Sequence, residues 1–249
     1  MRRTLPRSAY SAGTGPGLDS LSMNAPAVPR RARCLRSAFV QALGAFVLGC
    51  AVVVPAAGQG LDADAKQLAD WVSRSGDHQS RPFYIVDKRN ARLHVFDAAA
   101  KLIATSPVLL GLAHGDDSVP GIGDRKMSEI QPHERTTPAG RFVGERGRNH
   151  TGETIVWVDY DAAVSMHRVR ANVKHERRLE RLASNSIADN RISYGCINVP
   201  AAFYDAHVWP VFAQRRTAMI YVLPETRPLE SVFPVADAAH VARGPAGSR

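Results

Sequence analysis

Residues 82–110 read PFYIVDKRNARLHVFDAAAKLIATSPVLL, and this stretch decides the fold class. Three short apolar or alternating runs are separated by two polar turns. The runs are Phe83–Val86, Arg92–Phe96 and Leu102–Leu110, and the turns are Asp87–Asn90 and Ala98–Lys101. Short runs that follow one another across turns are typical of antiparallel strands. The stretch therefore predicts a β-meander and a mainly β protein.

The segments on either side extend this prediction. Upstream, Leu61–Ser75 has apolar residues at helical spacing behind an Asp-rich first turn, which predicts an amphipathic helix. Downstream, Thr136–Phe142 is predicted as a turn entering a strand. Further strands are predicted at Ile155–Val158, Ala163–Met166 and Ala218–Leu223, and helices at Lys174–Ser184 and Pro200–Phe212. Between them, Ala113–His133 is long for a structureless loop, which favours a functional role. We expect a single sheet-dominated domain with one or two side helices.

The charge of the chain is concentrated in its first part. The formal net charge is +9, from 32 Lys and Arg against 23 Asp and Glu. Residues 1–59 hold seven arginines and one acidic residue, so 25 basic and 22 acidic residues remain downstream. The body is therefore almost balanced, and a nucleic-acid partner is not expected.

Residues 1–58 predict an export leader. Arg30–Arg36 is a basic n-region, Ala38–Val54 is apolar apart from Gln41, and Pro55–Gly58 offers small residues suited to signal peptidase. Met23 is an alternative start that would shorten the leader. A retained membrane anchor is the alternative to cleavage, because the apolar run approaches the roughly 20 residues that span a bilayer. In either case we expect the body in the periplasm or cell envelope, with transient membrane contact through the leader.

The predicted division of the chain has four parts. They are a leader at 1–58, a helix and linker at 59–81, a catalytic domain at 82–225 and a loose C-terminal tail at 226–249.

The predicted body of the protein contains a single cysteine. Cys34 and Cys50 lie in the leader, so Cys196 is the only cysteine of the body. It has no intramolecular disulfide partner, and one thiolate with scattered histidines makes no structural zinc site. Exported proteins usually pair their cysteines or lack them. A solitary one is therefore either a small buried hydrophobe or a nucleophile, and composition alone leaves both readings open.

Three segments in order resemble the L,D-transpeptidase catalytic domain family, also called the YkuD family. They are Thr137–Phe142 (TPAGRF), Met166-His167 at the end of an apolar strand, and Ser193–Asn198 (SYGCIN). The start of the meander is also similar, so the resemblance runs from about Pro82 to Glu225. It implies a mainly β fold, a single β-sandwich domain with one or two side helices preceded by a signal peptide.

The chain departs from the family pattern at several positions. Tyr194 stands in place of a histidine, Asn198 in place of an arginine, and Arg168 in place of a glycine. Twenty-eight residues separate His167 from Cys196, which is longer than is usual in the family. We expect these departures to change contacts with the substrate more than the reaction at Cys196 and His167.

The predicted catalytic residues are Cys196, His167 and Gly195. A thiol needs a base or a positive charge to react as thiolate near neutral pH, and a histidine supplies both. Gly195 permits a tight turn that would aim its own N–H and that of Cys196 at one point, as an oxyanion hole. The alternative for His167 is a strand-end histidine bonded to a carbonyl, and His175 is the rival base in a charged helix.

The predicted substrate-binding residues surround this core: Arg191, Asn198, Arg168, Ser193 and Tyr194. Arginine and amide side chains suit carboxylate or amide groups, although Arg191 would equally suit a surface position. Ser193 would also support the turn by bonding to backbone.

The resemblance implies a peptidoglycan cross-linking reaction. Cys196 would attack a tetrapeptide stem, expel D-alanine and pass the acyl group to an amine of another stem, with no metal or organic cofactor. Peptidoglycan stem peptides are thus the expected partners. The alternatives are an L,D-carboxypeptidase or cross-link hydrolase with the same core and, in another class, a cell-wall binding module without activity.

Overall fold

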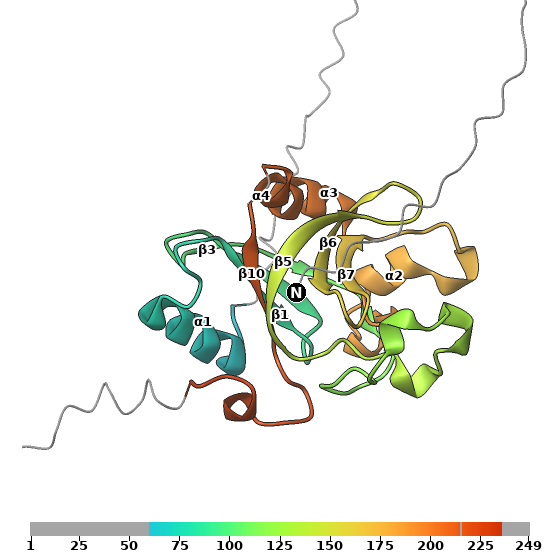
Figure 1. Ribbon diagram of the computed structural model, residues 1–249, viewed down its shortest axis with the longest axis horizontal. Helices are drawn as coiled ribbons and strands as arrows, with labels where there is room; N and C mark the ends of the chain where they lie inside the picture. Colours follow the sequence, from blue (N-terminus) through green and yellow to red (C-terminus); the bar gives the residue numbers. More distant parts are fainter. Residues whose placement is uncertain (1–59, 215, 236–249) are drawn as a thin grey trace, which may run out of the picture. The chain divides into compact units, whose positions relative to one another are not determined.

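The architecture is that of a large mixed β-sheet with helices on both faces (Figure 1). The computed structural model describes residues 60–214 and 216–235. Eight strands pair in the order β3-β2-β1-β10-β5-β6-β7-β9. Their bounds are β1 (Phe83–Asp87), β2 (Arg92–Phe96), β3 (Leu102–Pro107), β5 (Gly140–Arg148), β6 (Thr154–Asp159), β7 (Val164–Arg168), β9 (Ile197–Val199) and β10 (Ala218–Val222). The mainly β prediction is confirmed.

The predicted meander forms β1, β2 and β3, which pair antiparallel with Phe83 opposite Phe96 and Arg92 opposite Pro107. The third run is not one strand. β3 ends at Pro107, whose ring nitrogen cannot donate to a ladder. The chain then forms the two-residue β4 (Leu110–Gly111), which pairs in parallel with β8 (Arg191–Ser193) in a small second sheet.

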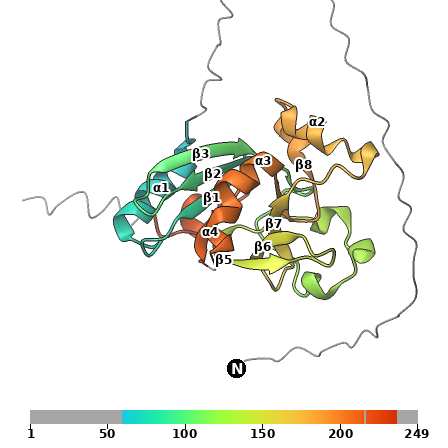
Figure 2. The same ribbon diagram turned by 90° about the horizontal axis from the view of Figure 1, so that it is seen from above.

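Alternating residues of the central strands enter two apolar cores. Tyr84 and Val86 of β1 pack in one core with residues of β6, β7 and β9, so two halves of the bent sheet face each other as in a sandwich. Phe83 and Ile85 enter the other core, against α1 (Ala63–Ser75). Since both faces are covered, all five residues of β1 are buried, and Figure 2 shows helices on either side.

The N-terminal helix is confirmed. α1 begins after Asp62, whose carboxylate accepts from the Ala65 amide at 2.7 Å, and ends at Gly76 with φ of 68°. Such caps satisfy amide and carbonyl groups that lack partners at helix ends.

The other two helix predictions need correction. Instead of one helix at 174–184, a 3-10 turn at Lys174–Glu176 precedes α2 (Arg178–Ala183), because Arg177 has φ of 49° and breaks the repeat. The segment at 200–212 is helical but not uniformly α. A π turn at Tyr204–Val208 separates α3 (Ala201–Phe203) from α4 (Trp209–Ala213).

The prediction of a loose tail at 226–249 is wrong for residues 226–235. Leu229, Phe233 and Val235 are buried in the same core as α1, because their apolar side chains cover the outer face of β10. Residues 236–249 lie outside the described part. The predicted leader at 1–58, with Cys34 and Cys50, lies outside it as well. In the two described ranges no helix has the length and apolar character needed to cross a membrane.

Candidate active site

Parallel pairing of β7 and β9 brings the predicted histidine and cysteine together. Met166 lies opposite Ile197 and His167 opposite Asn198. Cys196 immediately precedes β9, so its sulfur lies beside the beginning of β7, 3.6 Å from Ser165 Oγ. Cys196 is partly exposed and is a free thiol, the only one among the described residues.

The imidazole of His167 is held in one tautomer. Its Nδ1 lies 2.8 Å from the carbonyl oxygen of Arg168, which can only accept a hydrogen bond. Nδ1 therefore carries the proton in the neutral ring, and Nε2 presents a lone pair. This arrangement leaves Nε2 as the basic nitrogen.

Cys196 and His167 shift each other's ionisation. Burial raises the pKa of the Cys196 thiol, but the interaction with the nearby His167 and its positive charge outweighs burial, so the pKa lies below the ordinary value. Burial likewise lowers the pKa of His167, and its bond to Cys196 outweighs this and raises the pKa. Both shifts favour a thiolate–imidazolium pair.

The turn before the cysteine requires glycine. Gly195 has φ of 123°, and a Cβ there would lie 2.6 Å from the carbonyl oxygen of Thr136. Thr137 Oγ1 donates to the Gly195 carbonyl at 2.8 Å, and Ser193 Oγ donates to the Cys196 carbonyl at 2.6 Å. Ser193 thus supports the turn by bonding to backbone.

Only one of the two expected oxyanion donors is free. The Gly195 amide donates to Ser193 Oγ at 3.1 Å. Within the described ranges the Cys196 amide has no acceptor. Gly195 therefore shapes the turn through its backbone conformation, and the N–H beside the sulfur remains available.

The predicted substrate-binding side chains are mostly engaged with protein groups. Arg168 bonds Asp205 and Thr154 and lies over the Tyr204 ring at 4.5 Å. Arg191 is 5% exposed and pairs with Glu225, so it is not a surface charge. Its other bond goes to the Lys88 carbonyl, and its Nε is buried without a hydrogen-bond partner among the described residues.

Tyr194 and Asn198 lie on either side of Cys196 in the sequence. The guanidinium of Arg135 stacks over the Tyr194 ring at 3.8 Å. Asn198 is fully buried, and its Nδ2 lies 3.5 Å from His167 Nε2 and donates to the Cys196 carbonyl at 3.2 Å.

A buried ion network supports the turn and was not predicted from the sequence. Lys88 Nζ donates to Asp116 at 2.7 Å and to the Thr137 carbonyl at 2.9 Å, and lies 3.6 Å from Glu225. Glu225 in turn binds Arg191. The one signal in the sequence was the long Gly- and Asp-rich loop that contains Asp116, since Lys88 reads as an ordinary turn residue.

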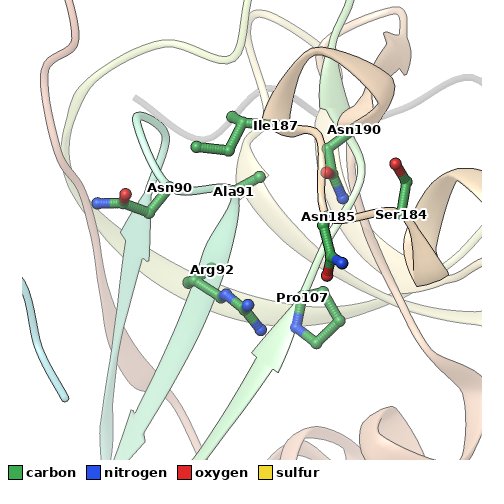
Figure 3. A pocket seen from close by; sticks show the side chains of 8 residues that line it. All are labelled: Asn90, Ala91, Arg92, Pro107, Ser184, Asn185, Ile187 and Asn190. Atoms are coloured by element: carbon green, nitrogen blue, oxygen red, sulfur yellow. The ribbon is translucent and has the colours of Figure 1, made fainter. Parts of the chain in front are cut away.

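A hollow of about 280 Å³ lies between the β1–β2 turn and residues 184–190 (Figure 3). Its amide groups are largely committed to the fold: Asn90 bonds Asp62 and Asp87, and Asn190 bonds the Val108 carbonyl. Neither Cys196 nor His167 lines it.

No family model matches the chain, and no curated protein matches it. Among solved structures, a mutant of the Enterococcus faecium L,D-transpeptidase aligns with a TM-score of 0.33 and 16% identity, over 57% of this chain and 50% of that one. A mutant of the helical cell shape determining protein from Campylobacter jejuni aligns with a TM-score of 0.40 and 14% identity, over 73% and 62%. The L,D-transpeptidase from Mycobacterium smegmatis aligns with 0.33 and 15%, over 57% and 58%.

The chain thus spans 50 to 62% of the length of these three proteins.

Proposed function

We propose that this chain is a peptidoglycan L,D-transpeptidase that works through a thioester on Cys196. The observation that carries the proposal is a partly exposed cysteine, the only one among the described residues, that interacts with a histidine of defined tautomer. The three ordered sequence motifs agree with it. Stem peptides are the proposed partners, and the cell envelope, reached through the leader, is the proposed location.

The first half of the reaction is acyl transfer to sulfur. His167 Nε2 takes the thiol proton, and the thiolate of Cys196 attacks the carbonyl carbon of the third residue of a tetrapeptide stem. The carbonyl oxygen gains negative charge, which the free amide of Cys196 is placed to stabilise. The C–N bond to the terminal D-alanine then breaks, and its amine leaves with the proton from His167.

The second half passes the acyl group onward. The side-chain amine of a second stem loses a proton to His167 and attacks the thioester carbonyl. The C–S bond breaks, the proton returns to sulfur, and a cross-link is formed. If water takes the place of the amine, the same residues perform carboxypeptidase chemistry.

The deciding experiment is incubation of the purified chain with tetrapeptide muropeptides, followed by mass spectrometry of both protein and products. We expect an acyl adduct on Cys196 equal to the stem without its terminal alanine, and a cross-linked dimer in the products. Tripeptide without dimer would favour the carboxypeptidase. Cys196→Ala is the matched control, and equal product formation by this variant would contradict the proposed nucleophile.

A further inference from the structure

Arg178 comes from the segment predicted as a charged helix and contacts Asn198, which lies beside the Cys196–His167 pair. It is the first residue of α2, and its side chain is only 14% exposed. Nε donates to Glu176 at 2.6 Å, and Nη1 donates to Oδ1 of Asn198. The residues between His167 and Cys196 therefore contribute a side chain to the surroundings of the site.

This contact determines which end of the Asn198 amide faces the histidine. A guanidinium has only donors, so it must meet the amide oxygen. The amide nitrogen is then turned toward His167 Nε2, at 3.5 Å, and toward the Cys196 carbonyl. An N–H donor next to Nε2 suits the lone pair of the neutral ring. It disfavours the imidazolium form, in which Nε2 also carries a proton.

We infer that Arg178 is a positioning residue of the Cys196–His167 pair, acting through Asn198 to keep the amide oxygen away from His167 Nε2. The inference rests on the proposed function for the role of that pair. With the amide so oriented, a proton on Nε2 is passed to sulfur or to the leaving amine and is not retained by a neighbouring oxygen.

Loss of Arg178 would change this orientation for a physical reason. Asn198 is fully buried, and a buried acceptor that loses its donor is unfavourable because water cannot replace the lost bond. The remaining bond of the amide, from Nδ2 to the Cys196 carbonyl, is 3.2 Å long, and that carbonyl already accepts from Ser193. The oxygen would therefore turn toward the nearest proton donor, the imidazolium N–H of His167.

Other charged and titratable groups also act on His167. Cys196 raises its pKa, and the positive charge of Arg170 lowers it. Arg178 itself adds a positive charge nearby, so removing it would raise the pKa of His167 even without rotation of the amide. The test must separate this effect of charge from the effect that passes through Asn198.

A double-mutant cycle makes this separation. The titration of His167 is followed by NMR in the full chain as wild type, Arg178→Ala, Asn198→Ala and the double variant. His167→Ala identifies the resonance. We expect Arg178→Ala to move the midpoint up by about one pH unit, and the turnover number to fall roughly tenfold. In the Asn198→Ala background, the same substitution should give a clearly smaller shift, because only the direct effect of the lost charge remains.

Arg178→Lys keeps a donor and a charge, and should keep the midpoint near that of wild type if Arg178→Ala proves unstable. Arg177→Ala is the matched control, since this neighbour is 71% exposed and bonds Glu180. A shift that persists undiminished without Asn198, or no shift at all, would overturn the inference while leaving the proposed function intact. Failure of His167→Ala to change Cys196 alkylation would instead contradict the proposed pair and the inference together.

Discussion

Thr137 ties the chain entering β5 to the turn before the cysteine, because its hydroxyl donates to the Gly195 carbonyl at 2.8 Å. The same hydroxyl accepts from the Gly111 amide at 2.9 Å, and the Thr137 carbonyl accepts from Lys88. One buried threonine thus joins β4, the ion network and the cysteine turn.

Replacing this threonine tests the connection. Thr137→Val keeps the shape of the side chain but leaves the Gly111 amide and the Gly195 carbonyl without their partner. We expect the free energy of unfolding to fall by about 1–3 kcal/mol, and the alkylation rate of Cys196 to fall with it. Urea unfolding measures the first quantity. Thr151→Val, whose hydroxyl bonds Asn149 on an exposed turn, should change stability by less than about 0.5 kcal/mol.

The backbone at Gly195 supports a second prediction. Gly195→Ala adds a Cβ both at positive φ and 2.6 Å from a carbonyl oxygen, so the turn must shift and displace the sulfur. Backbone strain of this kind should lower the free energy of unfolding by about 1–3 kcal/mol. We expect activity to fall by more than the loss of folded protein explains. Gly121→Ala is the control, with φ of 73° and no atom within 4 Å of the added Cβ. Equal activity of the two variants would show that the turn does not position the nucleophile.

The Cys196–His167 pair predicts the pH dependence of the thiol. In wild type, alkylation by iodoacetamide should have its midpoint below the roughly 8.5 of a free cysteine. His167→Ala removes the bond and charge that lower the pKa and leaves burial, which raises it. The midpoint should therefore move to higher pH, and turnover should fall on the order of 10²–10⁴-fold.

His175→Ala is the matched control for this measurement, because His175 is exposed on the 3-10 turn before α2. Its profile should coincide with that of wild type. A shift in His175→Ala with none in His167→Ala would show that the base is His175 and would contradict the assignment to His167.

Asp116 predicts how stability responds to acid. Burial raises the pKa of Asp116, but hydrogen bonds from Lys88 and Thr226 outweigh it and hold the pKa well below the ordinary value. A carboxyl with a lowered pKa in the folded state stabilises the fold above its unfolded pKa of about 4, and this stabilisation is lost as the pH falls. The contribution of Asp116 to the free energy of unfolding should therefore be steady above about pH 5 and decline below it.

Asp116→Asn isolates that contribution. The variant leaves Lys88 without its closest anion, so we expect a loss of about 3–5 kcal/mol at pH 7 and a smaller further loss at pH 3 than in wild type. Asp70→Asn, which removes an exposed pair with Lys66, should cost less than about 1 kcal/mol. An unchanged slope in Asp116→Asn would assign the acid sensitivity to other carboxylates.

The C-terminal segment supports a prediction on stability alone. Phe233 is 2% exposed and meets the Tyr221 ring edge-on at 6.1 Å. Phe233→Ala should cost about 3–5 kcal/mol because it empties part of the core beside α1. Leu179→Ala, at a site that is 57% exposed, is the control with little expected effect. Thermal unfolding of the two variants distinguishes a packed segment from a loose one.

The sequence by itself determined the strands of the meander and the N-terminal helix, and it made Cys196 and His167 the candidate catalytic residues. These rest on local patterns: alternation of apolar residues, an Asp cap before a helical repeat, and a lone cysteine after Gly195. Such patterns act over a few residues, so they are visible without knowledge of the fold. They also suggested Arg191 as a substrate ligand, because an arginine next to a motif has no visible partner in one dimension.

Only the tertiary structure decided which charges meet. Arg191 lies 34 residues before Glu225, and Lys88 lies 28 residues before Asp116. Arg178 meets Asn198 across the end of the parallel β7–β9 pair. These contacts contribute to stability because they are buried: an ion or amide removed from water needs a partner within the protein. The packing of Phe233 against Tyr221 also depends on the tertiary structure. Apolar residues near the C-terminus are buried only where the fold brings them against an apolar face of a distant strand.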